Sequence, residues 1–189
     1  MPCLLLTGYG SAPTGVIFAS DTFYFIPLDG GSSSSSSSIS SPRQLQPPRP
    51  ADFPVSAQVI SSSEILLAYQ NHGCFVDFHG QETRRQIVEW EKMPMEIVFT
   101  SPFLYVVHDD SIEILEVSDD PQKTFLEERE VFECVNAHLI GRQLGGGVII
   151  SVSSQDSTEV HRFSTSGARG RIQKRRGASP CATLKRTKN

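Results

Sequence analysis

The most constraining feature of this sequence is a pair of short strand-like runs that recurs along the chain. In each pair an apolar run is followed by a polar turn and then by a run in which apolar and polar residues alternate. Three such pairs begin at Ile65, Phe103 and Gly147. Turn-forming residues, Gln70-Asn71-His72 in the first pair and Asp109-Asp110 in the second, separate the two runs. Helical periodicity is weak throughout, so we expect an all-β chain.

The spacing of the pairs narrows the choice of fold. They lie roughly 40 residues apart, which is the period of a four-stranded propeller blade. Inner blade strands are buried on both faces and read as continuous apolar runs, whereas outer strands alternate. An immunoglobulin-like sandwich is the alternative, but the sequence lacks its Cys–Trp–Cys spacing. The expected strands are Val16–Ala19, Phe23–Pro27, Val55–Ile60, Glu64–Tyr69, Gly73–Phe78, Thr83–Trp90, Met95–Thr100, Phe103–His108, Ser111–Val117, Val131–Val135, His138–Gly141, Gly147–Ser153 and Thr158–Phe163.

Two polar segments depart from this pattern. Residues 29–52 hold seven consecutive serines and several prolines, and residues 167–189 are poor in large apolar side chains. Such segments cannot bury enough apolar area to offset the entropy of ordering them, so both are expected to be disordered. The chain is therefore divided into a β domain over residues 1–166, interrupted by the insert 29–52, and a tail over residues 167–189.

The charge of the chain is divided in the same way. Residues 1–166 carry 9 basic and 21 acidic side chains, whereas the tail carries 8 basic and no acidic ones. An acidic body repels phosphate backbones, which argues against a nucleic-acid-binding domain. The tail offers a contact for an anionic membrane. It also places Ser179 after a basic pair and before Pro180, as a candidate phosphorylation site.

No residue pattern in the sequence predicts a catalytic, cofactor-binding or metal site, so we expect no enzyme. The five histidines lack metal-binding spacing, and His72, His79 and His108 are expected to be exposed at turns. Gly145-Gly146-Gly147 lacks the lysine of a phosphate-binding loop. The scattered cysteines suit reduced core thiols, and no apolar run approaches the ~20 residues that span a bilayer. We therefore expect a cytoplasmic protein.

The segment from Glu64 to Val117 carries a more specific signal. A strand that ends in an aromatic residue leads to the hairpin Gly73-Cys-Phe-Val76-Asp77-Phe-His-Gly80, and a strand containing Arg84 then runs to Trp90. This arrangement resembles the citron homology domain of citron-type Rho-interacting kinases and of their myotonic-dystrophy-related relatives. The resemblance extends over about residues 14–165.

The resemblance implies a seven-bladed β-propeller, of which this chain holds about three to four later blades. It also implies a regulatory module that binds small GTPases or cytoskeletal regulators, in the setting of Rho signalling, actomyosin contraction and cytokinesis. The alternatives are a parent protein that is a Rho exchange factor or GTPase-activating protein, and a membrane-associated module that uses the basic tail. The residues that carry the resemblance are interpreted as structural, with an Asp77–Arg84 pair across strands and Trp90 between blades: Gly73, Val76, Asp77, Gly80, Arg84 and Trp90.

Overall fold

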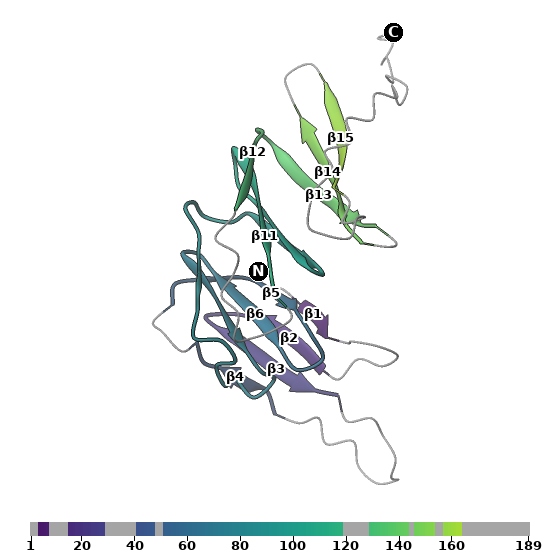
Figure 1. Ribbon diagram of the computed structural model, residues 1–189. Helices are drawn as coiled ribbons and strands as arrows, with labels where there is room; N and C mark the ends of the chain where they lie inside the picture. Colours follow the sequence, from purple (N-terminus) through teal and green to yellow (C-terminus); the bar gives the residue numbers. More distant parts are fainter. Residues whose placement is uncertain are drawn as a thin grey trace.

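The computed structural model describes residues 4–7, 15–28, 41–47, 51–118, 129–143, 146–153 and 157–163 (Figure 1). The regular elements of these residues are all β-strands, as the periodicity predicted. They form four antiparallel sheets, three with four strands and one with three. The described residues contain no helix that is long and apolar enough to cross a membrane.

Each sheet is built from strands that follow one another in the chain. The first sheet comprises β1 (Leu4–Thr7), β2 (Gly15–Ala19), β3 (Phe23–Pro27) and β4 (Arg43–Leu45). The second comprises β5 (Pro54–Val59), β6 (Ile65–Tyr69), β7 (His72–Val76) and β8 (Val88–Glu89). The third comprises β9 (Glu96–Thr100), β10 (Phe103–Val107), β11 (Ser111–Glu116) and β12 (Glu130–Glu133), and the fourth β13 (Ala137–Arg142), β14 (Val148–Ser153) and β15 (Thr158–Phe163).

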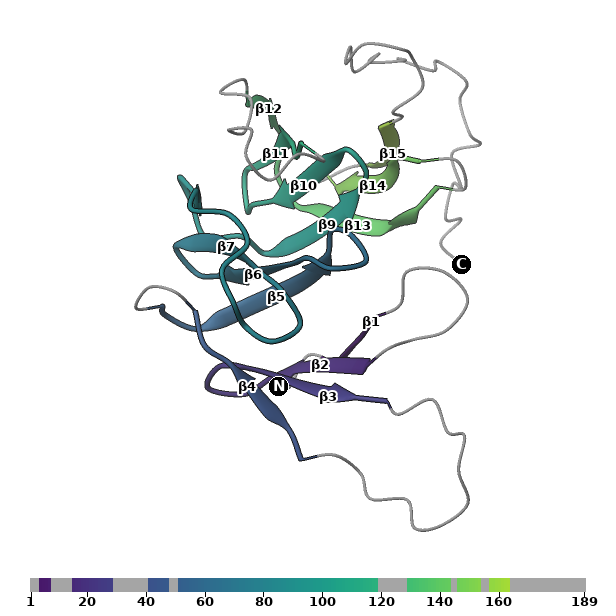
Figure 2. The same cartoon turned by 60° about the horizontal axis from the view of Figure 1, so that its bottom comes forward.

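The sheets pack face to face in chain order, as propeller blades do (Figure 2). Three apolar clusters fill the spaces between the first and second, the second and third, and the third and fourth sheets. Every residue of β6 and of β10 is buried, because the two middle sheets have a neighbour on both faces. In β2 and β14, which belong to the end sheets, buried residues alternate with partly exposed ones at the start of the strand. Whether a strand is buried at every position or at alternate positions therefore depends on whether its sheet lies in the middle or at an end of the row.

The first strands of neighbouring sheets are held together by side chains. The amide of Gln58 on β5 donates to the carbonyl of Ile97 on β9 at 3.0 Å, and its oxygen accepts from Arg142 on β13 at 3.2 Å. Glu96 on β9 accepts from the backbone N–H of Leu139 on β13 at 2.7 Å. These bonds draw β5, β9 and β13 toward one another, which is the inner-strand arrangement of a propeller. The four sheets are blades in an open row.

Two predictions about strands are wrong. β4 lies inside the segment 29–52 that was expected to be disordered, because Leu45 is fully buried against the first two sheets and its strand pairs with β3. The expected strand Thr83–Trp90 is reduced to β8, at Val88–Glu89. The side chains of Thr83 and Arg84 instead donate hydrogen bonds to buried Glu64, so side-chain contacts rather than strand pairing hold this stretch in place.

The thiol of Cys74 behaves as the sequence predicted for a core cysteine. It is buried between the first two sheets, and desolvation raises its pKa to about 12. Cys134 is partly buried at the end of β12, and there too burial raises the thiol pKa.

Candidate protein-interaction surface

The turns and connections at one end of the sheets form a single surface. The carbonyl of Phe53 accepts from Gln70 N in the β6–β7 turn at 3.1 Å, and Asn71 O accepts from Trp90 N at 3.2 Å. At the next sheet, Asp110 O accepts from Cys134 N at 3.0 Å. The connections into the third and fourth sheets are thus each bonded to a hairpin turn of the preceding sheet, and the connection into the second sheet is bonded to the β6–β7 turn of that sheet itself. We call this the junction surface, formed by residues 52–53, 70–71, 91–95, 109–110 and 134–136.

Exposed apolar side chains recur on the junction surface. Phe53, Met95 and Val135 lie within two residues of the first strand of the second, third and fourth sheets, and are 76%, 60% and 57% exposed. Met93 in the same connection as Met95 is 52% exposed. Single exposed apolar residues are ordinary, but a series at equivalent positions of consecutive blades offers a shared contact area.

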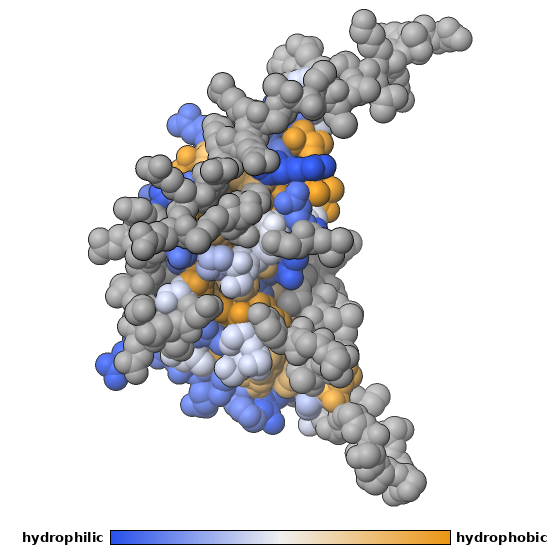
Figure 3. Space-filling view, turned by 45° about the vertical axis from the view of Figure 1, so that its right-hand side comes forward, coloured by the Kyte–Doolittle hydropathy of each residue, from blue (hydrophilic) through white to orange (hydrophobic). Residues whose placement is uncertain are grey.

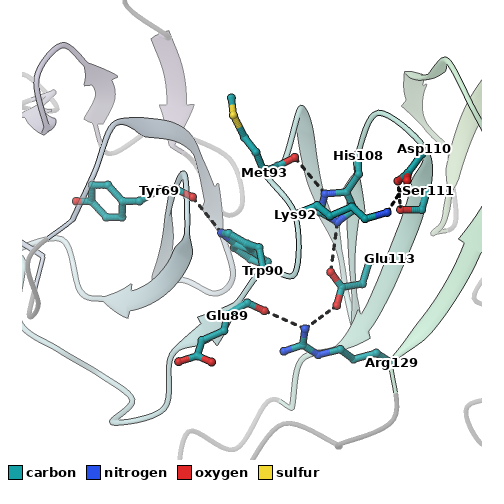
Figure 4. Close-up of polar contacts among 10 residues, drawn as sticks. All are labelled: Tyr69, Glu89, Trp90, Lys92, Met93, His108, Asp110, Ser111, Glu113 and Arg129. Atoms are coloured by element: carbon teal, nitrogen blue, oxygen red, sulfur yellow. Dashed lines mark hydrogen bonds and ion pairs between the residues drawn. The ribbon is translucent and has the colours of Figure 1, made fainter.

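A hollow of about 460 Å³ opens between the β8–β9 connection and β12. Val131 and Val135, both 57% exposed, form its apolar lip. The carboxylates of Glu91, Asp110, Glu113 and Glu133 line the hollow together with a single lysine, Lys92. The ammonium of Lys92 is bound to Asp110 and lowers the pKa of that carboxyl (Figure 4). The hollow is therefore acidic as well as apolar. Its lining residues are Glu91, Lys92, His108, Asp110, Ser111, Glu113, Val131, Glu133, Cys134 and Val135.

A buried polar network forms the base of this hollow. Glu113 and His108 are each 3% exposed, and Glu113 Oε2 lies 3.4 Å from His108 Nε2. The other carboxylate oxygen accepts from Arg129 Nη1 at 2.9 Å, and the same nitrogen donates to the carbonyl of Glu89 (Figure 4). His108 Nδ1 lies 3.2 Å from the carbonyl of Met93, so the ring connects β11 to the exposed β8–β9 connection.

The expectation that His108 is exposed is therefore wrong. The tight turn contains Asp109 and Asp110, and His108 precedes it as the continuation of β10, where its backbone N–H donates to Ser111 O. Its side chain consequently points into the space between the second and third sheets. Sequence reasoning also missed Glu113 and Arg129, because a glutamate in an alternating strand is typical of an exposed position.

The glycines and the tryptophan of the family motif are needed for packing. A Cβ atom on Gly73 would lie 2.9 Å from Leu66 Cδ1 and 2.9 Å from Trp90 Cζ2, so this position has no room for a side chain. Trp90 lies in the apolar cluster between the second and third sheets, as expected, and its indole N–H donates to Tyr69 O at 3.0 Å. Gly80 has φ +83°, a conformation that favours glycine. Val76 is fully buried.

The predicted ion pair between Asp77 and Arg84 is wrong. Asp77 instead accepts from the backbone N–H groups of His79 and Gln81 at 2.7 and 2.8 Å and holds the turn that contains Gly80. Arg84 binds Glu64 with two nitrogens, Nε–Oε1 2.8 Å and Nη2–Oε2 2.6 Å, and both side chains are at most 6% exposed. Glu64 gave no sequence signal, because it stands at the start of an apolar run with no motif around it.

The motif residues thus lie in the blades, and of these only Trp90 adjoins the junction surface. Ser179 and the basic tail lie outside the described residues. In the part of the chain that the structure describes, no group of three His, Cys, Asp or Glu side chains is placed to hold a metal ion.

Comparisons with known proteins place this geometry in a family. The CNH domain model matches residues 3–137. Citron Rho-interacting kinase of Homo sapiens is 29% identical over 118 residues, and that of Mus musculus 30% identical. These matches cover 57% of this chain and 6% of each kinase, so the chain corresponds to a small part of those proteins. Serine/threonine-protein kinase MRCK alpha of Homo sapiens is 30% identical over 64 residues, which is 34% of this chain and 4% of that kinase.

A solved structure described as the AfRom2 CNH domain has the same fold, with a TM-score of 0.54 at 13% identity. The likeness covers 78% of this chain and 46% of that one. The family model itself extends over more than half of the chain and includes the first three sheets. The chain therefore belongs to the CNH domain family.

Proposed function

We propose that this chain is the non-catalytic protein-interaction module of a citron-like Rho-interacting kinase. The observation that carries the proposal is the match to citron Rho-interacting kinases over 118 residues. In this role the domain binds a small GTPase or a cytoskeletal regulator and brings it to a kinase that acts on actomyosin contraction and cytokinesis. The proposed location is the cytoplasm, at the cytoskeleton.

The junction surface supports the proposal. Protein interfaces are built on a centre of aromatic and methionine side chains with a polar rim. Phe53, Met93 and Met95 supply such side chains, and the acidic hollow beside them supplies the charge that orients a partner. The partner therefore presents apolar side chains together with lysine or arginine.

A binding experiment with matched variants tests the proposal. Purified chain, both intact and without residues 167–189, is titrated with Rho-type GTPases in the GTP-bound and GDP-bound forms, and affinity is measured by calorimetry. We expect Met95→Asp and Val135→Asp each to weaken binding by about tenfold or more, as loss of a central contact does. Val160→Asp is the control, because Val160 is 59% exposed on β15, away from the junction surface. An equal loss with Val160→Asp, or binding to none of these GTPases, would contradict the proposal.

A second candidate function rests on the basic tail. Eight basic residues and no acidic ones between positions 167 and 189 favour attraction to anionic lipid, at about 1 kcal/mol for each charge near the surface. Co-sedimentation with phosphatidylserine vesicles, with and without residues 167–189, tests it. Vesicle binding that survives removal of the tail would exclude this function. A Rho exchange factor or GTPase-activating protein as the parent is distinguished by the sequence upstream of the domain.

A further inference from the structure

The described part of the chain ends close to the acidic hollow, a few residues before the basic tail begins in the sequence. Phe163 ends β15, and its ring centroid lies 5.5 Å from that of Phe132 and 6.1 Å from that of Tyr105. Phe132 belongs to β12, and its side chain packs toward the fourth sheet. Successive side chains of a strand point to opposite faces, so its neighbours Val131 and Glu133 line the hollow on the other side of the same strand. β12 therefore lies between Phe163, the last described residue, and the hollow.

The charges of the two parts are complementary. Four carboxylates line the hollow, those of Glu91, Asp110, Glu113 and Glu133. Asp110 and Glu113 already have cationic partners in Lys92 and Arg129. Among the described residues, Glu91 and Glu133 form no ion pair, and neither glutamate is buried. The tail brings eight basic side chains without a single acidic one.

The length of the chain is sufficient for the contact. β12 is the outermost strand of its sheet, so a segment can pass over its edge without displacing another described strand. Arg169 is the sixth residue after Phe163, and six extended residues span about 20 Å. This is about twice the ~10 Å between packed sheets.

We propose that the basic segment 169–188 of this chain docks in the acidic hollow of the same molecule. Its basic side chains pair with Glu91 and Glu133, and the segment covers the apolar lip formed by Val131 and Val135. The docked segment covers part of the junction surface, so a protein partner cannot bind there. The segment thus acts as an intramolecular inhibitor. Phosphorylation of Ser179 adds about −1.5 to −2 of charge to the segment and weakens the contact.

The cysteines of the chain provide a direct test. Cys134 lines the hollow and Cys181 lies in the tail. The full chain is treated with a short bismaleimide at low protein concentration, and the linked peptides are identified by mass spectrometry. We expect a Cys134–Cys181 link in the monomeric fraction. The same reaction with Val135→Cys serves as a second arm, because that position is 57% exposed and its thiol is accessible. Absence of the link in both arms would overturn the proposal.

Salt and charge reversal distinguish docking from chance encounter. Raising NaCl from about 0.1 M to about 1 M shortens the Debye length from about 10 Å to about 3 Å, so the yield of the link should fall about fivefold or more. The double variant Glu91→Lys/Glu133→Lys should lower it to a similar extent. Glu82→Lys is the matched control, an exposed glutamate at the opposite end of the second sheet. A cross-link yield that does not change with NaCl concentration, or that falls equally with Glu82→Lys, would also overturn the proposal.

This docking does not depend on the proposed function, because the linking reaction contains no partner protein. Loss of GTPase binding would leave the Cys134–Cys181 link unchanged, and loss of the link would leave the affinity of a tail-free domain for its partner unchanged. The two proposals therefore fail separately.

Discussion

At the scale of single residues, the second sheet depends on a charged pair that is almost completely removed from water. Glu64 and Arg84 share two hydrogen bonds, and the guanidinium also lies 4.7 Å from the centre of the Phe75 ring. A carboxylate buried in this way is tolerated only while its partner is present. Family resemblance marked Arg84, but not its partner. The reason is that an ion pair between distant positions leaves no local pattern in the sequence.

Removing one member of this pair should be costly. We expect Arg84→Ala to lower the free energy of unfolding by about 3–5 kcal/mol, because Glu64 is left buried without a countercharge. Denaturant unfolding followed by circular dichroism measures the change. The neighbouring Arg85→Ala should stay within about 0.5 kcal/mol, since Arg85 is exposed. Equal effects of the two substitutions would show that the pair contributes nothing specific.

The close approach at Gly73 leads to a second prediction. We expect Gly73→Ala to destabilise the fold by about 1–3 kcal/mol, because the added methyl group overlaps Leu66 and Trp90. Gly141→Ala is the matched control, since a Cβ atom there meets nothing within 4 Å. Thermal unfolding compares the two variants. A melting temperature lowered as much by Gly141→Ala as by Gly73→Ala would contradict the packing argument.

At the scale of elements, the sequence predicted the strands that supply whole apolar runs. β6 with β7, β10 with β11 and β14 with β15 lie at the three pairs read from the sequence, because the first strand of each pair supplies buried apolar residues to the spaces between sheets. The last strands of the first two sheets, β4 and β8, were not predicted with these bounds, because they are only three and two residues long. The period of 40 residues predicted the blades, whereas the hollow and its polar base depend on contacts between blades.

The short strand β4 should nevertheless matter for stability. Its residue Leu45 is fully buried, and we expect Leu45→Ala to lower the free energy of unfolding by about 2–5 kcal/mol. Leu28→Ala, at a position 43% exposed, should cost much less. Chemical denaturation of both variants checks this. If Leu45→Ala has no more effect than Leu28→Ala, β4 does not form part of the stable fold.

At the scale of the whole molecule, the row of blades has two ends. The middle sheets are covered on both faces, but no described sheet packs on the far face of the fourth. Ile140 and Val160 of that sheet are 58% and 59% exposed, and Figure 3 shows apolar side chains among charged ones over this part of the molecule. The AfRom2 CNH domain, in contrast, is about twice as long as the stretch matched here. An isolated chain therefore carries apolar surface and strand edges that a further blade would cover.

This open end predicts self-association of the isolated chain. We expect the purified chain to form dimers or larger species, because exposed apolar residues on a sheet face and an unpaired edge strand both favour contacts between copies. Sedimentation velocity at several concentrations measures the distribution. The double variant Ile140→Lys/Val160→Lys should shift it toward monomer, since two charges on the open face make a dry contact between copies costly. Met93→Lys, which changes the junction surface instead, should leave the distribution unchanged. A monomer at all concentrations that melts sharply and reversibly would show that four blades are stable alone, and the open face would then need no partner.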